Sequence, residues 1–232
     1  MIVDITRCKY AQGYLPKATH GFFNPFFAGA NMAVRRQALE ATGGFDPKCR
    51  TGEDVDLSVR LSRAGWELWY EPAAEVKHQD PHTFRQMLRQ WFGYGFGRPY
   101  LYKKHLGRPR LQFYARGDIA GSSTPYGARC LADLPFPFYG VVFLSAYHLF
   151  HFALLWLFVG AVAGSPPCCL CAGAVALAAG FSYATIRFAW RRPLRSIGMF
   201  CLRYCCDSAF VWGSLLGGLR QGALFLDATR TR

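Results

Sequence analysis

Charge is absent from one long stretch of this 232-residue sequence. Between Asp133 and Arg187 there are 53 consecutive residues without an Asp, Glu, Lys or Arg. An ordinary solvent-exposed segment is excluded there. A membrane-spanning helix needs about 20 apolar residues, so the stretch is long enough for two. We predict a membrane hairpin with spans over 138–163 and 168–189, joined by a turn at 164–167.

A long apolar run is also missing from the first residues, MIVDITRCKY, so we expect no leader that directs secretion. Positive charge is distributed in agreement: 19 Lys and Arg precede Asp133, none falls inside the hairpin, and four lie between Arg187 and Arg195. Because cytoplasmic flanks of membrane helices are rich in Lys and Arg, we expect both ends of the hairpin to face the cytoplasm.

Acidic residues are scarce, and 14 Asp and Glu against 27 Lys and Arg give a formal net charge of +13. The basic excess is concentrated beside the apolar hairpin, so it indicates membrane topology and argues against nucleic-acid binding. The nine cysteines contain no paired C-x-x-C motifs, and most lie in apolar segments. We expect them to be small hydrophobic residues and not metal ligands or disulfides.

The first third of the chain alternates strand-like and helix-like patterns. The expected elements are a buried strand over 26–34 (FFAGANMAV), a short helix over 35–43 ended by Gly43-Gly44, a polar loop, a helix from Asp54 to Gly65, and short strands over 66–72 (WELWYEP) and 75–78 (EVKH). This alternation of strands and helices indicates an α/β layer.

The segment before the hairpin is amphipathic and basic. Apolar side chains recur at helical spacing from Phe84 to Phe92, with Arg and Gln on the other face, which predicts an amphipathic helix. Residues 85–129 carry nine Lys or Arg and one acid. Such a cluster can bind anionic lipid headgroups.

After the hairpin, residues 196–219 are apolar except for Arg203 and Asp207, which can pair at i, i+4. The residues that share one helical stripe are Ser196, Arg203, Asp207, Ser214 and Gly218. A third span would leave the C-terminal arginines outside, against the charge rule. We favour a helix that lies in the cytoplasmic interface or re-enters from it.

Five short motifs follow one another along the chain: GANMAVRR, GGFD, GEDVDLSVRLSRAGWELWYEP, VKH and RQMLRQWFGYGFG. In this order and at these spacings they resemble the C-terminal half of the catalytic domain of bacterial family 2 glycosyltransferases, inverting enzymes with a nucleotide-diphospho-sugar donor. The resemblance runs from about Phe26 to Lys104. It implies an α/β partial GT-A (Rossmann-like) catalytic domain followed by α-helical membrane segments.

The division of the chain that follows has four parts. They are the C-terminal part of the catalytic domain (1–80), an amphipathic and basic juxtamembrane segment (81–133), the transmembrane hairpin (134–189), and an interfacial or re-entrant helix with a basic tail (190–232).

Glu53 and Asp54 match the E-D pair of the family. The resemblance implies that Asp54 is the general base that removes a proton from the acceptor hydroxyl, with Glu53 beside it. A carboxylate at the start of a helix suits this role, because the base must be held within hydrogen-bond reach of the attacking hydroxyl. The alternative is that Glu53, Asp54 and Asp56 only cap the helix, whose first turn favours acids.

The same resemblance implies further site residues. These are Gly29, Ala30 and Asn31 beside donor sugar and acceptor, His78 as a ligand of a divalent cation, and Arg85, Gln86, Arg89 and Trp91 as an imperfect Q-x-x-R-W signature that meets the diphosphate and the acceptor. Gln90 rotates Trp91 by about 100° from the family position, so processivity is not carried over. The alternatives are a close-packed strand, a structural histidine and a basic interfacial helix, respectively.

The N-terminal half of the family, with the D-x-D that binds metal and diphosphate, has no counterpart before Phe26. We expect a C-terminal portion of such an enzyme, inactive alone, that uses Mg²⁺ or Mn²⁺ only with the missing half. The expected partners are a nucleotide-sugar donor, a lipid-linked or cell-envelope glycan acceptor and membrane lipids, at the bacterial inner (cytoplasmic) membrane with the catalytic part facing the cytoplasm. The alternative is a non-catalytic membrane-bound module for binding or assembly.

Overall fold

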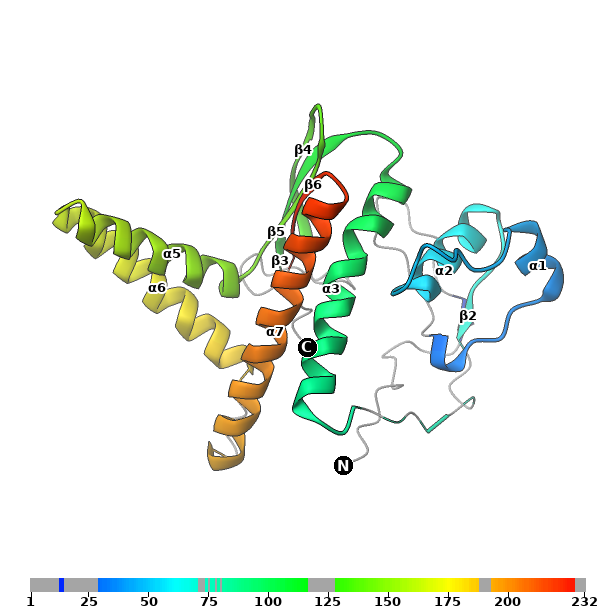
Figure 1. Cartoon of the computed structure of the whole chain (residues 1–232), viewed down its shortest axis with the longest axis horizontal. Coiled ribbons are helices and arrows are strands. Elements are labelled where there is room, and N and C mark those ends of the chain that lie inside the picture. Colours follow the sequence, from blue (N-terminus) through cyan, green and yellow to red (C-terminus); the bar gives the residue numbers. More distant parts are fainter. Residues whose placement is uncertain are drawn as a thin grey trace.

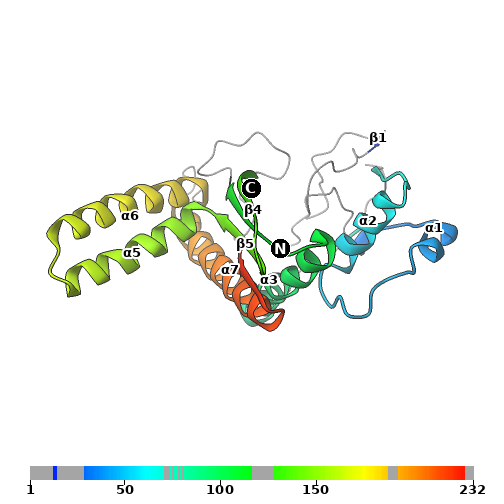
Figure 2. The same ribbon diagram turned by 90° about the horizontal axis from the view of Figure 1, so that it is seen from above.

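The computed structural model (Figure 1) describes residues 13–14, 29–70, 74, 76–77, 79, 81–116, 128–187 and 193–227. Within these ranges the architecture is mixed α/β. Two long helices lie side by side at the centre. Seen from above (Figure 2), two short helices extend to one side of this pair and an apolar helical hairpin extends to the other.

The helices and strands have the following bounds. The helical elements are η1 (Gly29–Asn31, a 3-10 turn), α1 (Arg36–Ala41), α2 (Glu53–Arg63), α3 (Phe84–Leu106), α5 (Ala146–Val162), α6 (Pro166–Arg187) and α7 (Pro193–Arg220). The strands are β1 (Gly13–Tyr14), β2 (Trp69–Tyr70), β3 (Arg110–Arg116), β4 (Ala128–Pro135), β5 (Tyr139–Leu144) and β6 (Ala223–Leu226).

Glycines limit the two helices around the acidic motif. Helix α1 ends before Gly43 and Gly44, whose φ angles are 76° and 70°, and α2 is bounded by Gly52 at 77° and Gly65 at 89°. Only glycine adopts such angles readily. The two helices pack through a small core made by Ala38, Leu57, Leu61 and Leu68. Both helices were predicted from the sequence, and both predictions are confirmed.

Two predicted strands are wrong where the structure describes them. In the run 26–34, residues 29–31 form η1 and the following residues are irregular, because Gly, Ala and Asn are poor strand formers. In the run 75–78, Val76 and Lys77 are exposed and irregular. The run 66–72 contributes only β2, which pairs antiparallel with β1.

Helix α3 is much longer than the amphipathic repeat of residues 84–92 predicts. It begins in a capping box, in which the Gln86 amide donates to the Thr83 hydroxyl at 3.2 Å and the Thr83 amide donates to Gln86 Oε1 at 3.1 Å. It continues through the buried Pro99, and it ends at Gly107, whose φ is 77°. A proline removes one backbone hydrogen bond inside a helix, so packing of α3 on its neighbours must offset that loss.

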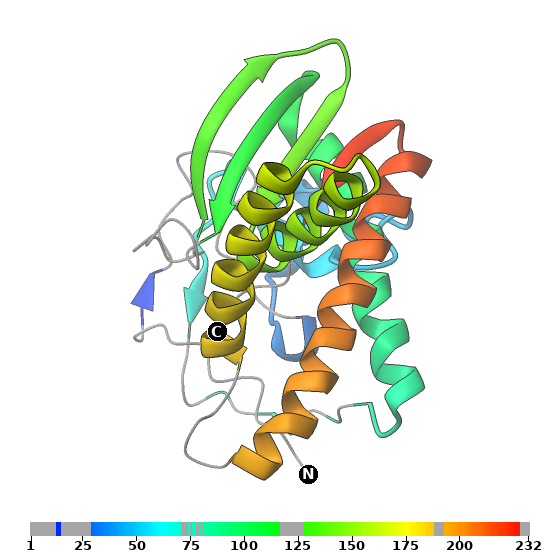
Figure 3. The ribbon, with the colours of Figure 1, turned by 90° about the vertical axis from the view of Figure 1, so that its left-hand side faces the viewer.

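A four-stranded sheet, which the sequence analysis missed, closes over the second half of α3 (Figure 3). Its strand order is β4-β3-β5-β6, with β3 antiparallel to β4, and β5 parallel to both β3 and β6. Aromatic rings join the sheet to α3: Tyr102 contacts Phe225 at a ring-centroid distance of 5.3 Å and Phe143 at 6.4 Å.

The sheet corrects the expected start of the first membrane span. Residues 139–144, the start of the first predicted span, form strand β5, and strands β3 and β4 lie in the region expected to be a juxtamembrane segment. In β5 the side chains of Val141 and Phe143 are buried, whereas Val142 and Leu144 are less so, which is the two-residue period of a strand. Counting apolar residues alone does not detect this period.

Helices α5 and α6 form the expected apolar hairpin. Gly164 makes the turn with a φ of 63°, and Pro166 and Pro167 begin α6, where their missing amide protons cost little. Of the helices in the described residues, α6 is the one long and apolar enough by length and composition to cross a membrane, over Pro166–Ala184. Helix α5 is also apolar but shorter, with 17 residues, so the first of the two predicted spans stays a prediction.

Helix α7 confirms that residues 196–219 are helical, and it packs closely along α3 (Figures 1 and 3). Gly95 of α3 leaves no room for a Cβ against the Phe210 carbonyl, and Gly213 and Gly217 of α7 leave none against the backbone of Phe92 and Phe96. In the stripe expected from the sequence, Asp207, Ser214 and Gly218 are buried. Asp207 accepts a hydrogen bond from the Tyr183 hydroxyl at 2.7 Å.

Candidate active site

Asp54 lies in the first turn of α2, directly after the loop that ends in Gly52. A Cβ at Gly52 would lie 2.6 Å from Leu101 Cδ1 of α3, and its φ is positive. The glycine of the GED motif is therefore required for two reasons: it bends the chain into α2 and it lets α3 pack against the bend. These constraints fix where the Asp54 side chain leaves the helix.

The Asp54 carboxylate meets the turn η1. The Gly29 amide donates to Asp54 Oδ2 at 3.0 Å, and the Val55 amide donates to Oδ1 at 2.8 Å. The Glu53 carboxylate lies beside the same turn, since a Cβ on Gly29 would be 3.9 Å from Glu53 Oε1. The E-D pair and Gly29, 25 positions apart in the chain, are thus neighbours in space.

This carboxylate is held in place and remains reachable. Asp54 and Glu53 are half-buried, while Gly29 and Ala30 are exposed. The Asn31 side-chain amide donates to the Ala74 carbonyl at 2.5 Å, which ties η1 to the segment after β2. A carboxylate oriented by two backbone amides, next to exposed small residues, can accept a proton from a hydroxyl that approaches over Gly29.

Asp56 points in a different direction, because two positions along a helix turn the side chain by about 200°. It is fully buried, and it pairs with Arg60 at 2.8 Å, Lys104 at 2.8 Å and His105 at 2.9 Å. Burial alone would raise its pKa, but the hydrogen bonds from Lys104 and Arg60 outweigh this and hold the pKa below its usual value. The cluster of three acids therefore has two separate surroundings.

Lys104 connects the acidic motif to the GGFD loop. Its ammonium group binds Asp46 at 2.6 Å as well as Asp56, and the Tyr100 hydroxyl donates to Asp46 at 2.6 Å. The hydrogen bonds from Lys104 and Tyr100 hold the pKa of Asp46 well below its usual range. The pKa of Lys104 is raised, because its bonds to Asp46 and Asp56 outweigh the effect of burial.

His105 completes this network in the neutral form. Its Nε2 lies 2.9 Å from Asp56 Oδ1, and its Nδ1 lies 3.3 Å from Arg63 Nη1. Because a guanidinium can only donate, we assign Nδ1 as the acceptor and Nε2 as the donor. Burial lowers the pKa of His105, and the neighbouring Asp56 does not reverse that direction.

The sequence analysis did not identify Tyr100, Lys104 and His105, although their spacing along the chain could have indicated them. They lie at i, i+4 and i+5 on one face of α3, opposite the acids of α2, but only if the helix is extended past Pro99.

The GYGFG motif within α3 has a related role. Thr51 donates to the Gly93 carbonyl at 3.1 Å, and a Cβ at Gly97 would overlap the Thr51 hydroxyl.

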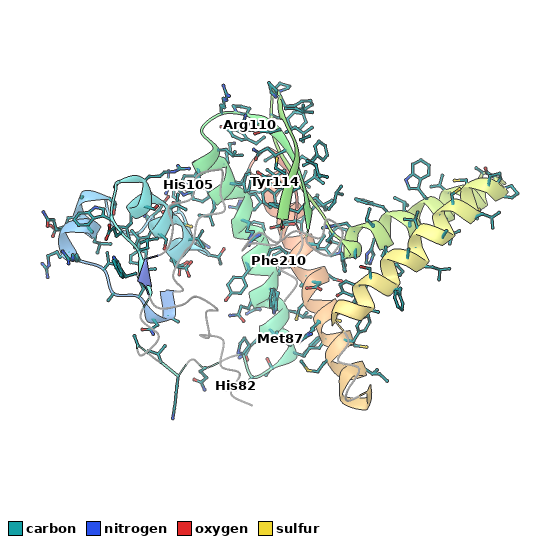
Figure 4. The ribbon with its side chains drawn as sticks, turned by 180° about the vertical axis from the view of Figure 1, so that it is seen from behind. His82, Met87, His105, Arg110, Tyr114 and Phe210 are labelled. Atoms are coloured by element: carbon teal, nitrogen blue, oxygen red, sulfur yellow. The ribbon has the colours of Figure 1, made fainter. Side chains whose placement is uncertain are left out.

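The four residues of the Q-x-x-R-W-like stretch lie elsewhere on α3. Gln86 is used by the capping box, and Trp91 packs edge-on against Phe210 with ring centroids 6.3 Å apart. Arg85 and Arg89 are exposed. Gly93 of α3 meets the loop before α2. Arg85 lies eight residues earlier, or about 12 Å away along the helix. Figure 4 shows the same separation, with His82 and Met87 near the start of α3 and His105 near its end.

The predicted cation ligand His78 lies outside the described residues. Across the described ranges, no group of three or more His, Cys, Asp and Glu side chains could hold a metal ion. The described residues therefore supply no ligand set for Mg²⁺ or Mn²⁺, and the divalent cation remains a prediction.

Comparison with known proteins gives first a class and then a family. The class is that of the glycosyl transferases, because the profile of Glycosyl transferase family group 2 matches residues 14–183. This range is well over half of the sequence, so the chain belongs to Glycosyl transferase family group 2. The four-stranded sheet and the α1–α2 unit are consistent with part of such a domain.

Three similar proteins illustrate the family. Succinoglycan biosynthesis protein ExoA of Rhizobium meliloti is 31% identical over 84 residues, 36% of this chain and 26% of its own length. N-acetylglucosaminyl-diphospho-decaprenol L-rhamnosyltransferase of Mycobacterium tuberculosis is 44% identical over 59 residues, 25% of this chain and 19% of its own. O-antigen chain rhamnosyltransferase WbaN of Salmonella anatum is 32% identical over 75 residues, 32% of this chain and 24% of its own.

The chain thus spans about a quarter or less of the length of these curated relatives. No solved structure shows a significant match to the chain.

Proposed function

We propose that this chain is part of a membrane-attached, inverting glycosyltransferase, and that Asp54 is its general base. The enzyme transfers a sugar from a nucleotide-diphospho-sugar to a hydroxyl of a lipid-linked or cell-envelope glycan. The observation that carries the proposal is the position of Asp54: it lies at the start of α2, oriented by the Gly29 and Val55 amides and open to approach over η1.

In the proposed chemical step the Asp54 carboxylate accepts one proton, from the acceptor hydroxyl. The acceptor oxygen forms a bond to the anomeric carbon, the bond from that carbon to the phosphate oxygen breaks, and the nucleoside diphosphate leaves with the bonding electron pair. The hydroxyl proton moves to the Asp54 carboxylate. A positioned base of this kind contributes about 10²–10⁴-fold in rate, and attack opposite the leaving group inverts the anomeric configuration.

The remaining predicted residues have supporting roles in this proposal. Gly29 and Ala30 present exposed backbone beside Asp54, so they would line the place where donor sugar and acceptor meet. Glu53 lies next to the same turn. Arg85 and Arg89 are exposed cations of α3 available to a phosphate-bearing ligand that approaches from outside the α2 region. A cation held by His78 would neutralise the diphosphate, and no step here depends on it.

Attachment to the membrane supports the acceptor class. Helix α6 is apolar and long enough to cross a bilayer, and the hairpin exposes large apolar side chains. One relative is named as a transferase to a diphospho-decaprenol compound and another as acting on O-antigen chains. An enzyme held at the membrane meets such an acceptor at a raised effective concentration.

Transfer can be tested with the protein in membranes, expressed together with any coding sequence that precedes it in frame. Incubation with a panel of nucleotide sugars should release nucleoside diphosphate with one or a few donors, in step with labelling of a lipid-extractable or glycan product. Absence of release with every donor, although the protein is folded and binds a donor, would contradict the proposal.

A second candidate is a non-catalytic module that keeps the glycosyltransferase-like part for binding or assembly. The short coverage of the relatives favours it, because a quarter of an enzyme need not contain a donor site. An in-frame segment with a D-x-D motif immediately upstream of the coding sequence would favour the enzyme, and its absence would favour the module.

A further inference from the structure

Helix α7 has two contrasting faces. One face packs inward, where Phe210, Gly213 and Gly217 meet α3 and Asp207 meets Tyr183. The opposite face is exposed and uncharged. We call it the outer stripe of α7, and it consists of Ile197, Cys201, Trp212, Leu216 and Leu219. At 100° per residue these five side chains lie within about 100° of one another around the helix.

This arrangement is the reverse of a surface helix in a soluble protein, which buries its apolar stripe and exposes its polar one. Here the carboxylate of Asp207 is 5% exposed, whereas Trp212 is 60% exposed and Leu219 is 64% exposed. Polar groups that face neighbouring helices and apolar groups that face outward are typical of helices in contact with lipid.

The contacts on the inward face agree with this interpretation. The glycines of α7 bring its backbone against the backbone of α3, as small residues do between helices in a bilayer. Hydrogen bonds also cross from α7 to the hairpin: Tyr204 bonds to His151 at 2.7 Å and Ser208 bonds to Tyr147 at 2.7 Å. Such bonds satisfy polar side chains where water is absent.

The outer stripe is continuous with the apolar surface of the hairpin. Tyr204 and Ser208 bind α5. On the helix surface Ser208 falls within the angular range of the stripe and Tyr204 lies beside it, so α5 meets α7 along the stripe itself. The large apolar side chains that the hairpin exposes include Trp156, Phe158, Val162, Leu170, Leu177 and Phe181. The hairpin leaves α7 on the side away from α1 and α2 (Figure 1), so these apolar surfaces face away from the candidate active site.

The pair α3 and α7 cannot stand upright across a bilayer. Arg85 and Arg89 are exposed at the start of α3, and Lys103 and Lys104 lie at its end. Between these ends, Arg98 pairs with Asp227. In an upright α3 this ion pair would lie at the depth of the hydrocarbon, where charged groups are costly. The end of α7 is bound to the same helix, because Lys103 donates to the Gln221 carbonyl at 2.7 Å.

We propose that the outer stripe of α7 is a lipid-contacting surface, so that α7 lies in the plane of the membrane interface, with α3 on its aqueous side and the hairpin inserted more deeply. The inference rests on the proposed membrane attachment and names its second contact. Since α3 also contacts Thr51 and Gly52 just before the E-D pair, this surface sets the height of Asp54 above the bilayer.

Native tryptophans allow a direct test. Three variants of the chain keep one tryptophan each, Trp212, Trp156 or Trp69, with the other five tryptophans changed to Phe. They are mixed with phosphatidylcholine–phosphatidylglycerol vesicles whose acyl chains are brominated either near the headgroup or near the chain end. Trp69 is the matched control, because it is 63% exposed but belongs to the α1–α2 side of the molecule.

The proposal predicts that Trp212 is quenched most by the shallow bromines, Trp156 most by the deep bromines, and Trp69 by neither. Quenching of Trp156 without Trp212 would show that the hairpin alone is inserted and would overturn the proposal while leaving membrane attachment intact. Deep quenching of Trp212 would indicate a third span and overturn it too. Absence of any quenching together with concentration-dependent self-association would mean that a second copy covers the stripe.

A second measurement does not require the multiple substitutions. Leu216→Asp places a charge on the outer stripe, and Leu131→Asp makes the same change on strand β4, where Leu131 is 55% exposed. Loss of one leucine contact with lipid should weaken binding to the same vesicles by about tenfold or more. L131D should bind as the unchanged protein does, and equal binding by L216D would overturn the proposal. The enzymatic proposal is tested separately, because neither measurement uses turnover.

Discussion

At the scale of the residue, a single acidic motif serves two purposes. Asp54 faces the turn η1 and stays accessible, whereas Asp56, two positions later, is buried and neutralised by Arg60, Lys104 and His105. The helical capping interpretation and the catalytic interpretation are therefore not exclusive. Negative charge is concentrated in this basic chain partly because the neighbouring helix brings cations to meet it.

Stability distinguishes the two aspartates. Asp56→Asn removes one partner of a buried charged network, and we expect it to reduce the free energy of unfolding by about 3 kcal/mol. Asp54→Asn, at a half-buried position with backbone partners, should change it by less than about 1 kcal/mol. Urea unfolding of the two variants checks this. Equal losses would contradict the separate surroundings of the two carboxylates.

His105 should make stability depend on pH. Its pKa is lowered on folding by burial, so the unfolded chain, with an ordinary value of about 6.5, binds the proton more readily. The contribution is complete above about pH 6.5 and is lost as the pH falls toward the folded-state pKa. Asp56 and Asp46, with lowered pKa values, lose their contributions only at pH values below about 4.

The measurement is the free energy of unfolding as a function of pH. His105→Gln keeps a hydrogen-bond donor but cannot titrate, so its stability should fall less than that of the unchanged protein between about pH 7 and pH 5. The same slope in H105Q and in the unchanged protein would rule out this role for His105.

At the scale of the element, α3 is the part that joins the others. Gly93 and Gly97 meet the loop before α2, and Gly95 meets α7, so alternate positions of one glycine motif serve two neighbours. The last turns of α3 carry Lys104 and His105 to Asp56, and Tyr102 to the sheet. A change in one packing face of α3 should therefore be felt at the others.

The close contact between α3 and α7 leads to a prediction about glycines. Gly213→Ala would force a Cβ into the Phe92 carbonyl, so we expect a loss of more than about 2 kcal/mol in stability. Gly198→Ala, on the same helix with no atom near its Cβ position, should be stabilising by about 0.5–1 kcal/mol. Thermal unfolding of both variants checks this, and a stabilising G213A would contradict the close packing.

How much the sequence predicted depends on the kind of signal. Glycines and helical periodicity located α1 and α2. The charge-free stretch located the apolar hairpin, and the Gly-Ser-Pro-Pro sequence at 164–167 located its turn. Strand β5 was missed because Val141 and its neighbours read equally well as apolar helix until burial reveals a two-residue period. The proximity of Gly29 to Asp54 came from family resemblance, and the link from Asp56 to His105 could not be seen without knowing that α3 passes through Pro99.

At the scale of the whole molecule, the apolar and the polar parts are separated. The hairpin and α1–α2 lie on opposite sides of the α3–α7 pair (Figures 1 and 2). The hairpin and the outer stripe of α7 expose large apolar side chains, whereas η1 and the candidate active site belong to the α1–α2 side. Helix α3 lies between them and touches both. A molecule of this shape can hold a base at a fixed height beside a membrane, which suits an acceptor confined to that surface.

The most direct test of the central claim is the rate of nucleoside diphosphate release by Asp54→Asn protein in membranes, measured with the donor that the unchanged protein uses. We predict a loss of about 10²–10⁴-fold with no change in membrane attachment. Glu40→Gln, which neutralises an exposed acid on α1, should keep the full rate. A rate for D54N within a few-fold of the unchanged protein would contradict the assignment of Asp54 as the base.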